Sequence, residues 1–458
     1  MGWPSRPALG REAPIRAGLD FAFGPAWRNL SHVVWLNGRP DVPWRRRWKL
    51  AGGGRILAVT LLTSACVSAA DRPCGEGPAT GAGSGVRPGA KAILRFAACA
   101  LEHGSPQEAL KSLDSLPVQD GDSHFRAGAL LVEHKLYAAA ARQFGMARRT
   151  YNDAYLAGYD QALAYLNAGD YAGAIRTANE LLNQGHETAE LASVAATAYL
   201  KNSQPQEAYN ALRLATHLDP KNEDAYVGLC GIALDRDDYD LGLEIAAIGL
   251  AHLPNSERLY LQRGVMRAMK GEFREAEQDF ATASKLAPQD VLPSVCLGLI
   301  SMQMGHLDKA VDGLRQAVLR HRDSYLGQYW LAKVLLQSGA APGTKEGEEA
   351  LAALRASVRL NPDFWHARAD LGKALLDRGA VPAAIVELEK AAVLNPSASS
   401  PLYLLAQAYR RQGDEARAKD LAARVSKMQA EEREGFPEAS LKRIIREGTS
   451  FPPNPSRP

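Results

Sequence analysis

A regular spacing along most of the chain constrains its fold more than any other feature. From Gly121 onward, equivalent residues recur every 34 positions, so that units begin at residues 121, 155, 189, 223, 257, 291 and 325. Further units begin at 365 and 399, and a shorter first unit covers about 90–120. A period of roughly 20–50 residues indicates stacked supersecondary units that share one continuous core.

Small residues and prolines keep a fixed phase in these units. Near the start of the second half of each unit stand Ala109, Ala140, Ala174, Ala208, Gly242, Ala276, Ala310, Ala350, Ala384 and Ala418. Just before that point, glycine recurs as Gly104, Gly169, Gly271, Gly305, Gly339, Gly379 and Gly413. Proline closes units at Pro220, Pro254, Pro288, Pro362 and Pro396. Glycine accepts the positive φ at a helix C-terminus and proline cannot continue a helix, so each unit is predicted to hold two helices joined by a tight turn.

Two units depart from the pattern. The unit at 325–364 has six extra residues, 340–345, rich in Gly and Pro, which predicts a longer loop between its helices. The unit at 223–256 has Gly242 and Gly249 where others have alanine, which predicts a local irregularity.

The period and these phased residues resemble the tetratricopeptide-repeat (TPR) family over residues 90–432. The resemblance implies an all-α, right-handed superhelical solenoid of about ten helix-turn-helix units. It also implies a non-catalytic scaffold that holds a protein or peptide in a concave groove lined by the first helices. A fold of this kind does not identify the partner.

The basic charge of the chain is concentrated before residue 71. Residues 1–70 carry ten Lys/Arg and three Asp/Glu, whereas the remainder carries 44 and 48, a net charge of −4. A body of this charge without a basic stripe does not favour nucleic-acid binding.

Residues 44–70 have the three parts of a secretory signal: a cationic block at 44–49, an apolar run at 56–62, and small residues at 65–70. The apolar run is too short to span a bilayer. The residues from Val67 to Ala69 suit a signal peptidase, and those from Leu62 to Cys66 resemble a loose lipobox with Cys66 as the lipidated residue. The sequence therefore predicts export to the bacterial periplasm or exterior, with lipid anchoring at Cys66 as an alternative. The membrane would be reached only through this segment.

The segments flanking the repeats carry separate expectations. A signal so far from the first residue favours translation from near Val33, Val42 or Leu50, in which case residues 1–43 would be a leader that is never made. The alternative is an uncleaved membrane-proximal helix. Residues 71–89, rich in Gly and Pro, are expected to form a flexible tether. Residues 433–458 should form a short helix and a disordered Pro-rich tail.

No pattern for catalysis, a metal or a cofactor is present in the sequence. The histidines are scattered, and no Cys-x-x-Cys occurs, so no catalytic residue, metal or cofactor is predicted. Cys230 and Cys296 lie two repeats apart, too far to form a bridge, and are expected to be small core residues. A bridge between Cys74 and Cys99 is left open.

Carrying the family geometry to this sequence gives a candidate partner-binding groove on the first helices. Its residues are Tyr159, Leu163, Leu200, Leu261, Val265, Leu299, Met302, Tyr329, Lys333, Lys373, Tyr403 and Arg410. The middle of this set is apolar and its C-terminal end is basic, which suits a peptide with apolar anchors and some acid at one end. Equally, the apolar members could pack between helices, as apolar stripes at helical spacing usually do.

Two functions remain open on these grounds. The first is an exported bacterial scaffold that organises partners of the envelope or of secretion machinery. The second is an accessory or regulatory subunit of an envelope enzyme complex, for example in polysaccharide synthesis.

Overall fold

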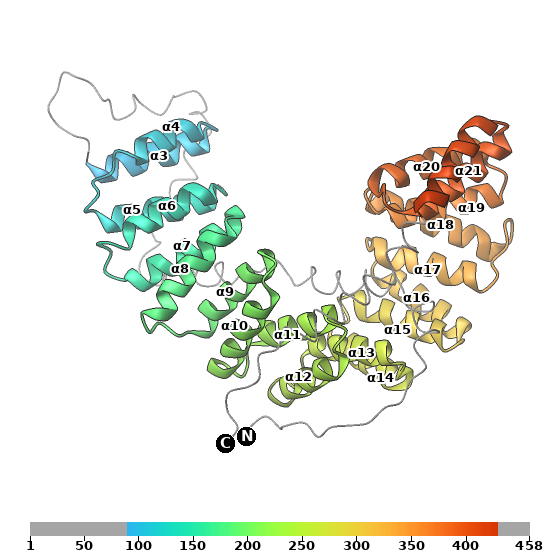
Figure 1. Ribbon diagram of the computed structural model, residues 1–458, viewed down its shortest axis with the longest axis horizontal. Helices are drawn as coiled ribbons and strands as arrows, with labels where there is room; N and C mark the ends of the chain where they lie inside the picture. Colours follow the sequence, from blue (N-terminus) through green and yellow to red (C-terminus); the bar gives the residue numbers. More distant parts are fainter. Residues whose placement is uncertain (1–88, 429–458) are drawn as a thin grey trace, which may run out of the picture. The chain divides into compact units, whose positions relative to one another are not determined.

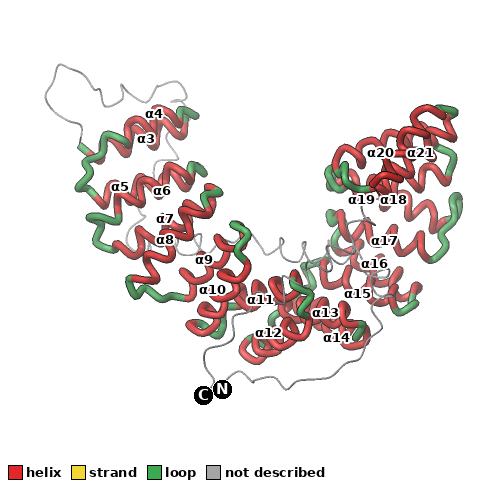
Figure 2. The backbone as a smooth tube through the Cα atoms, in the orientation of Figure 1, coloured by secondary structure: helices red, strands yellow, loops and turns green. Residues whose placement is uncertain are grey.

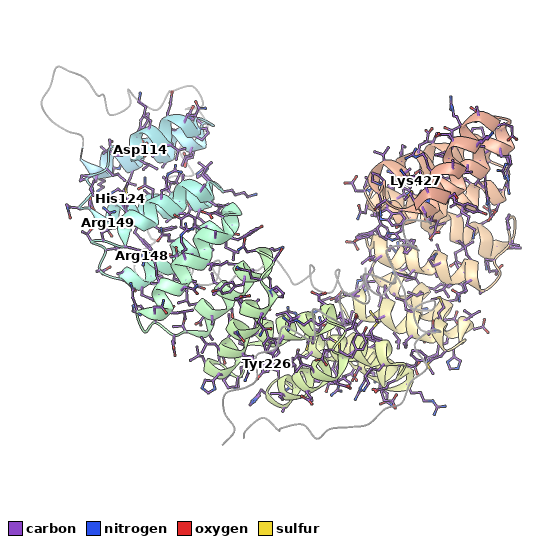
Figure 3. All side chains as sticks on the ribbon, viewed as in Figure 1. Asp114, His124, Arg148, Arg149, Tyr226 and Lys427 are labelled. Carbon is purple, nitrogen blue, oxygen red and sulfur yellow. The ribbon has the colours of Figure 1, made fainter. Side chains whose placement is uncertain are left out.

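The computed structural model describes residues 89–428, and Figures 1 and 2 show helices and loops without a strand in this part of the chain. The described residues divide into two compact units at the peptide bond between Lys270 and Gly271. The first unit holds α3 (Ala90–Glu102), α4 (Pro106–Leu113), α5 (Gly121–Glu133), α6 (Tyr137–Ala147), α7 (Ala154–Ala168), α8 (Tyr171–Asn183), α9 (Ala189–Lys201), α10 (Pro205–Leu218), α11 (Glu223–Asp235), α12 (Tyr239–His252) and α13 (Glu257–Lys270). The leader, the signal segment with Cys66, nearly all of the tether and the C-terminal tail lie outside the described residues.

The second unit holds α14 (Phe273–Leu286), α15 (Leu292–Gln303), α16 (Leu307–Arg320), α17 (Tyr325–Gln337), α18 (Lys345–Leu360), α19 (Trp365–Asp377), α20 (Val381–Leu394) and α21 (Ser399–Gln412). Residues 415–428 are also helical. We call the odd-numbered helices first helices and the even-numbered ones second helices, after their order in each repeat.

Within each unit the helices stack in the order of the sequence. First helices pack on the second helices that follow them within the unit, as α5 does on α6 and α19 on α20, and many second helices also pack on the next first helix. First helices of successive repeats touch as well, including α7 with α9 and α15 with α17. The predicted all-α repeat solenoid is therefore confirmed.

The turns between paired helices show why glycine recurs there. The seven phased glycines, Gly104 to Gly413, have φ between 75° and 93°, a left-handed conformation that costs glycine nothing. In three repeats the same turn is made by Lys135, Ser203 and Asp237, with φ of 60°, 57° and 54°. A side chain with a Cβ pays about 1 kcal/mol or more for this conformation.

Replacing Lys135 or Ser203 by glycine is therefore expected to stabilise the first unit. Each change should raise the free energy of unfolding by up to about 1 kcal/mol, because the left-handed strain disappears while the exposed side chain makes no hydrogen bond or ion pair with residues 89–428. Thermal unfolding followed by circular dichroism measures the effect. Gly169→Ala, which adds the same strain to an equivalent turn, should lower the midpoint; a lower midpoint for Lys135→Gly would contradict the argument.

Small residues in the middle of first helices let paired helices approach closely. A Cβ built on Gly372 would lie 2.5 Å from Cγ of Leu388, and one on Gly128 would lie 2.6 Å from the ring of Phe144. Both partners are fully buried. The helices could not pair at this distance with a larger residue at either glycine.

The expected irregularity in the repeat at 223–256 is not observed. α12 runs without interruption through Gly242 and Gly249. Met266 and Leu259 of α13 occupy the room that a methyl group would take, each with an atom 2.8 Å from the position of the missing Cβ. The larger side chains of the next helix thus compensate for the two small residues.

The six-residue insertion forms a loop, as predicted. α17 ends at Gln337 and α18 begins at Lys345, with left-handed Gly339 and Gly343 between them. The Thr344 hydroxyl accepts a hydrogen bond from the Gly347 amide and caps α18. Gly347 packs directly against the carbonyl of Ala341, so this loop is tied closely to the helix it precedes.

Candidate partner-binding face

The predicted groove residues all lie on first helices, but they divide sharply by exposure. Six of them are at most 7% exposed: Tyr159, Leu163, Leu261, Val265, Leu299 and Tyr329. Leu200 and Met302 are half-buried. The six buried residues fit the alternative that apolar members of the set pack between helices.

The exposed members gather on α17, α19 and α21 of the second unit. Lys373 and Arg410 are exposed, Lys333 is 41% exposed at its side chain, and Tyr403 is 55% exposed. We call these four residues the cationic face. Three neighbouring first helices thus contribute three cations and one open aromatic ring to it.

Two of the three cations have no electrostatic partner among residues 89–428. Lys333 Nζ lies 3.1 Å from Oδ2 of Asp370, one helix away. Lys373 and Arg410 make no hydrogen bond or ion pair with the described residues. The neighbouring Arg411 differs, since its guanidinium donates to the Leu376 carbonyl at 2.6 Å and joins α21 to α19. Lys373 and Arg410 therefore keep their full hydrogen-bonding capacity for a ligand.

An aromatic cluster lies beside the cationic face. The Tyr329 ring meets Phe364 edge-on at 5.0 Å, and His366 stacks on Trp365 at 3.7 Å between centroids. Burial raises the pKa of Tyr329 well above its usual value, with the charge of Asp370 and its hydrogen bond adding to the effect. Tyr329 therefore stays protonated and donates to Asp370, which in turn holds Lys333.

His366 is neutral at physiological pH. Burial lowers its pKa to about 4; the charge of Asp370 opposes the shift and that of Lys333 adds to it. Because the folded-state pKa lies below the usual 6.5, the unfolded chain binds more protons between these values. Stability is consequently lost as the pH falls from about 6.5 to about 4, and is unaffected above that window.

We expect this loss to reach about 2 kcal/mol in the second unit, allowing for the partial solvent exposure of the ring. His366→Phe preserves an aromatic ring and removes the titrating group. Urea unfolding of the wild type and the variant at a series of pH values measures the difference. If the free energies of unfolding of the wild type and the variant fall in parallel from pH 6.5 to 4, His366 does not cause the loss.

Asp370, Phe364 and His366 were not identified from the sequence. When the six inserted residues are allowed for, Lys373 is the equivalent of Lys333, and Asp370 precedes it by one helical turn. Aligning the repeats that begin at 325 and 365, with the insertion removed, would have revealed the pairing of Lys333 with Asp370. The stacking of His366 on Trp365 has no counterpart in the sequence pattern.

Between 89 and 428 no three His, Cys, Asp or Glu side chains are grouped so as to hold a metal ion. A small cavity lies among α5, α6 and α7 beside Asp160, Tyr137 and Phe144, with room for about one water molecule. None of the described helices is long and apolar enough to cross a membrane.

The cysteines take two roles. Cys230 and Cys296 are fully buried and free, as core residues should be. Burial raises the pKa of Cys230 to about 12 and that of Cys296 further. Cys99 on α3 is disulfide-bonded.

The stacked helix pairs and the open face on the first helices define an all-α repeat solenoid of the kind that serves as a protein-interaction scaffold. Models of the tetratricopeptide repeat match residues 346–401 and 402–427. Residues 346–427 are therefore identified as tetratricopeptide repeats.

Solved structures of the same kind are similar to the chain at low sequence identity. Yeast Tom70 is 15% identical, with 78% of this chain and 92% of that chain covered and a TM-score of 0.47. The Cut9–Hcn1 hetero-tetramer of the APC/C is 15% identical, with 69% and 63% covered and a TM-score of 0.43, so this chain spans less than two thirds of that one. A human IFIT1 dimer with m7Gppp-AAAA is 15% identical, with 68% and 90% covered and a TM-score of 0.36. A search of curated proteins gave no match.

Proposed function

We propose that the chain is an exported scaffold that binds an acidic segment of a protein partner on its cationic face. The observation that carries this proposal is the pair of exposed cations, Lys373 and Arg410, without an ion-pair or hydrogen-bond partner in residues 89–428. A partner carboxylate would gain a charge-assisted hydrogen bond from either of them. The exposed ring of Tyr403 offers apolar area next to these charges.

The fixed geometry of the face supports the same proposal. Asp370 accepts from Tyr329 and lies 3.1 Å from Lys333, so this lysine is oriented before any partner arrives. The Arg411 bond to the Leu376 carbonyl joins α21 to α19. Binding to groups that are already ordered costs less conformational entropy than binding to free side chains.

Photocrosslinking in the native host tests where a partner binds. Benzoylphenylalanine at Tyr403 should capture a partner, whereas the same residue at Val386, exposed on the second helix α20, should not. Leu163 and Val265 are unsuitable positions because both are buried. Equal crosslinking from both positions would mean that the partner does not bind preferentially at the cationic face.

Reversing the charges of the cationic face tests whether these cations bind the partner specifically or whether the partner binds non-specifically. Lys373→Glu with Arg410→Glu should weaken the captured complex at least about tenfold, since each carboxylate contact would become repulsive. Arg274→Glu is the matched control, an exposed arginine near the start of the second helix α14. If the captured protein is one stoichiometric enzyme of the envelope, the chain is its accessory subunit and not a general scaffold.

Export is supported by Cys99, because disulfides form and persist in oxidising compartments. The secretory pattern of residues 44–70 points the same way. Peptide mapping of the native protein without reductant, together with its N-terminal sequence, tests this part of the proposal. Recovery of residues 1–43 with a reduced Cys99 would argue against export, and fatty-acid labelling of Cys66 would establish the anchored form.

A further inference from the structure

The second helices of the second unit end in exposed aliphatic and basic side chains at equivalent positions. The last two residues of α14, α16, α18 and α20 are Lys285 and Leu286, Leu319 and Arg320, Arg359 and Leu360, and Val393 and Leu394. We call these eight residues the basic-aliphatic edge. All are exposed, with Leu319 at 57% and Val393 at 78%.

Equivalent positions of stacked repeats lie in a row, and Figure 1 shows α14, α16, α18 and α20 following one another through the second unit. The same positions of the first unit are mainly polar. They are Arg149 and Thr150, Asn183 and Gln184, His217 and Leu218, and Ala251 and His252. An exposed aliphatic residue at the end of every second helix is thus a feature of one unit and not of the repeat.

We propose that the basic-aliphatic edge docks on an anionic lipid surface. Its cations are supplemented nearby by Arg322, Arg355 and Lys390, against the acids Asp290, Asp323, Asp363, Glu387 and Glu389. Basic residues therefore outnumber acidic ones along a row that also exposes aliphatic side chains. Aliphatic side chains enter the headgroup region while neighbouring Lys and Arg meet lipid phosphates.

The spacing along the edge favours lipid over a protein partner. A first helix packs between successive second helices, as α15 does on both α14 and α16, so the aliphatic side chains of successive repeats stand apart. The core of a protein interface is contiguous and depleted of charge. A fluid lipid surface instead accepts each side chain separately, and the long stems of Lys and Arg reach the phosphates from between them.

The basic-aliphatic edge lies on second helices and is separate from the cationic face, which lies on first helices. Lipid docking at this edge would give the chain a membrane contact besides its N-terminal segment. Because no described helix is able to span a bilayer, the contact would be peripheral. Attraction between the basic residues and an anionic surface weakens as salt screens it.

Co-sedimentation of the full chain with vesicles tests the proposal. Wild-type protein should sediment with vesicles of phosphatidylglycerol and phosphatidylcholine, and much less with phosphatidylcholine alone. Leu319→Asp with Val393→Asp should lower the bound fraction at least about tenfold, since both insertions are lost. Both residues are exposed, so the fold is unaffected. Leu218→Asp, at the equivalent edge position of the first unit, is the matched control and should leave binding unchanged.

A second measurement separates this edge from any lipid contact made elsewhere in the chain. Benzoylphenylalanine at Val393 should form lipid adducts on irradiation with the anionic vesicles, and at Leu218 it should not. Absent adducts at Val393, equal adducts at both positions, or capture of protein in place of lipid in the native host would each overturn the proposal. Capture of the protein partner from Tyr403 should persist in the Leu319→Asp, Val393→Asp variant, so the two proposals can fail separately.

Discussion

Phe144→Ala is expected to destabilise the N-terminal part of the first unit by about 4 kcal/mol. The ring is fully buried, fills the space left by Gly128 and meets Phe125 edge-on at 5.4 Å. Removing it deletes this burial and leaves a cavity that the paired helices cannot easily close. Met146→Ala on the same helix is the control, because Met146 is 41% exposed and its loss should cost little.

The loss of stability caused by Phe144→Ala should remain local. Each repeat of a solenoid contacts only its neighbours, so the loss of one pair lowers the stability of that pair and of those next to it. Hydrogen exchange followed by mass spectrometry should show faster exchange in α3 to α8 and unchanged exchange in α14 to α20. Equal loss of protection in both units would mean that the array unfolds as one cooperative block.

The repeat architecture was predictable from sequence because each of its determinants is local. A left-handed turn favours glycine at Gly169, a close helix crossing requires a small residue at Gly372, and a helix stops before Pro396. Each constraint acts within one repeat, and its recurrence along the chain makes the pattern recognisable. The inserted loop after Gln337 was found for the same reason.

The division of the face into exposed and buried residues was not predictable, as three tyrosines show. Tyr159, Tyr329 and Tyr403 occupy the same position of their repeats but are 2%, 5% and 55% exposed. Tyr329 is covered by Phe364, which precedes the next first helix. No described first helix follows α21, so nothing of this kind covers Tyr403. The exposure of these rings thus depends on the side chains of the neighbouring repeat, which the periodic pattern does not describe.

The buried ion pair between Arg368 and Glu387 was missed for a related reason. Arginine on a first helix reads as a solvent-exposed residue, yet the Arg368 side chain is 10% exposed and that of Glu387 is 18% exposed. The guanidinium donates to the Glu387 carboxylate at 2.5 Å and to the Pro362 carbonyl at 2.6 Å. Neither the separation of 19 residues nor the phase of Arg368 distinguishes it from a surface residue.

Arg368→Ala is consequently expected to cost about 3–5 kcal/mol in the second unit, because the Glu387 carboxylate would keep its burial and lose its nearest cation. Lys390 Nζ, at 3.9 Å, compensates only in part. Arg378→Ala is the matched control: its partner Glu348 is 57% exposed, and the loss of a solvent-exposed pair should cost much less.

Replacing both members of the pair distinguishes the loss of a favourable bond from the burial of an unpaired charge. Arg368→Met with Glu387→Leu removes both charges, so most of the stability lost in Arg368→Ala should return. Urea unfolding, with hydrogen exchange in α19 to α21, measures the two variants and the control. A double variant as unstable as Arg368→Ala would mean that the ion pair itself stabilises the packing of α19 on α20, and that the uncompensated charge is not the cause.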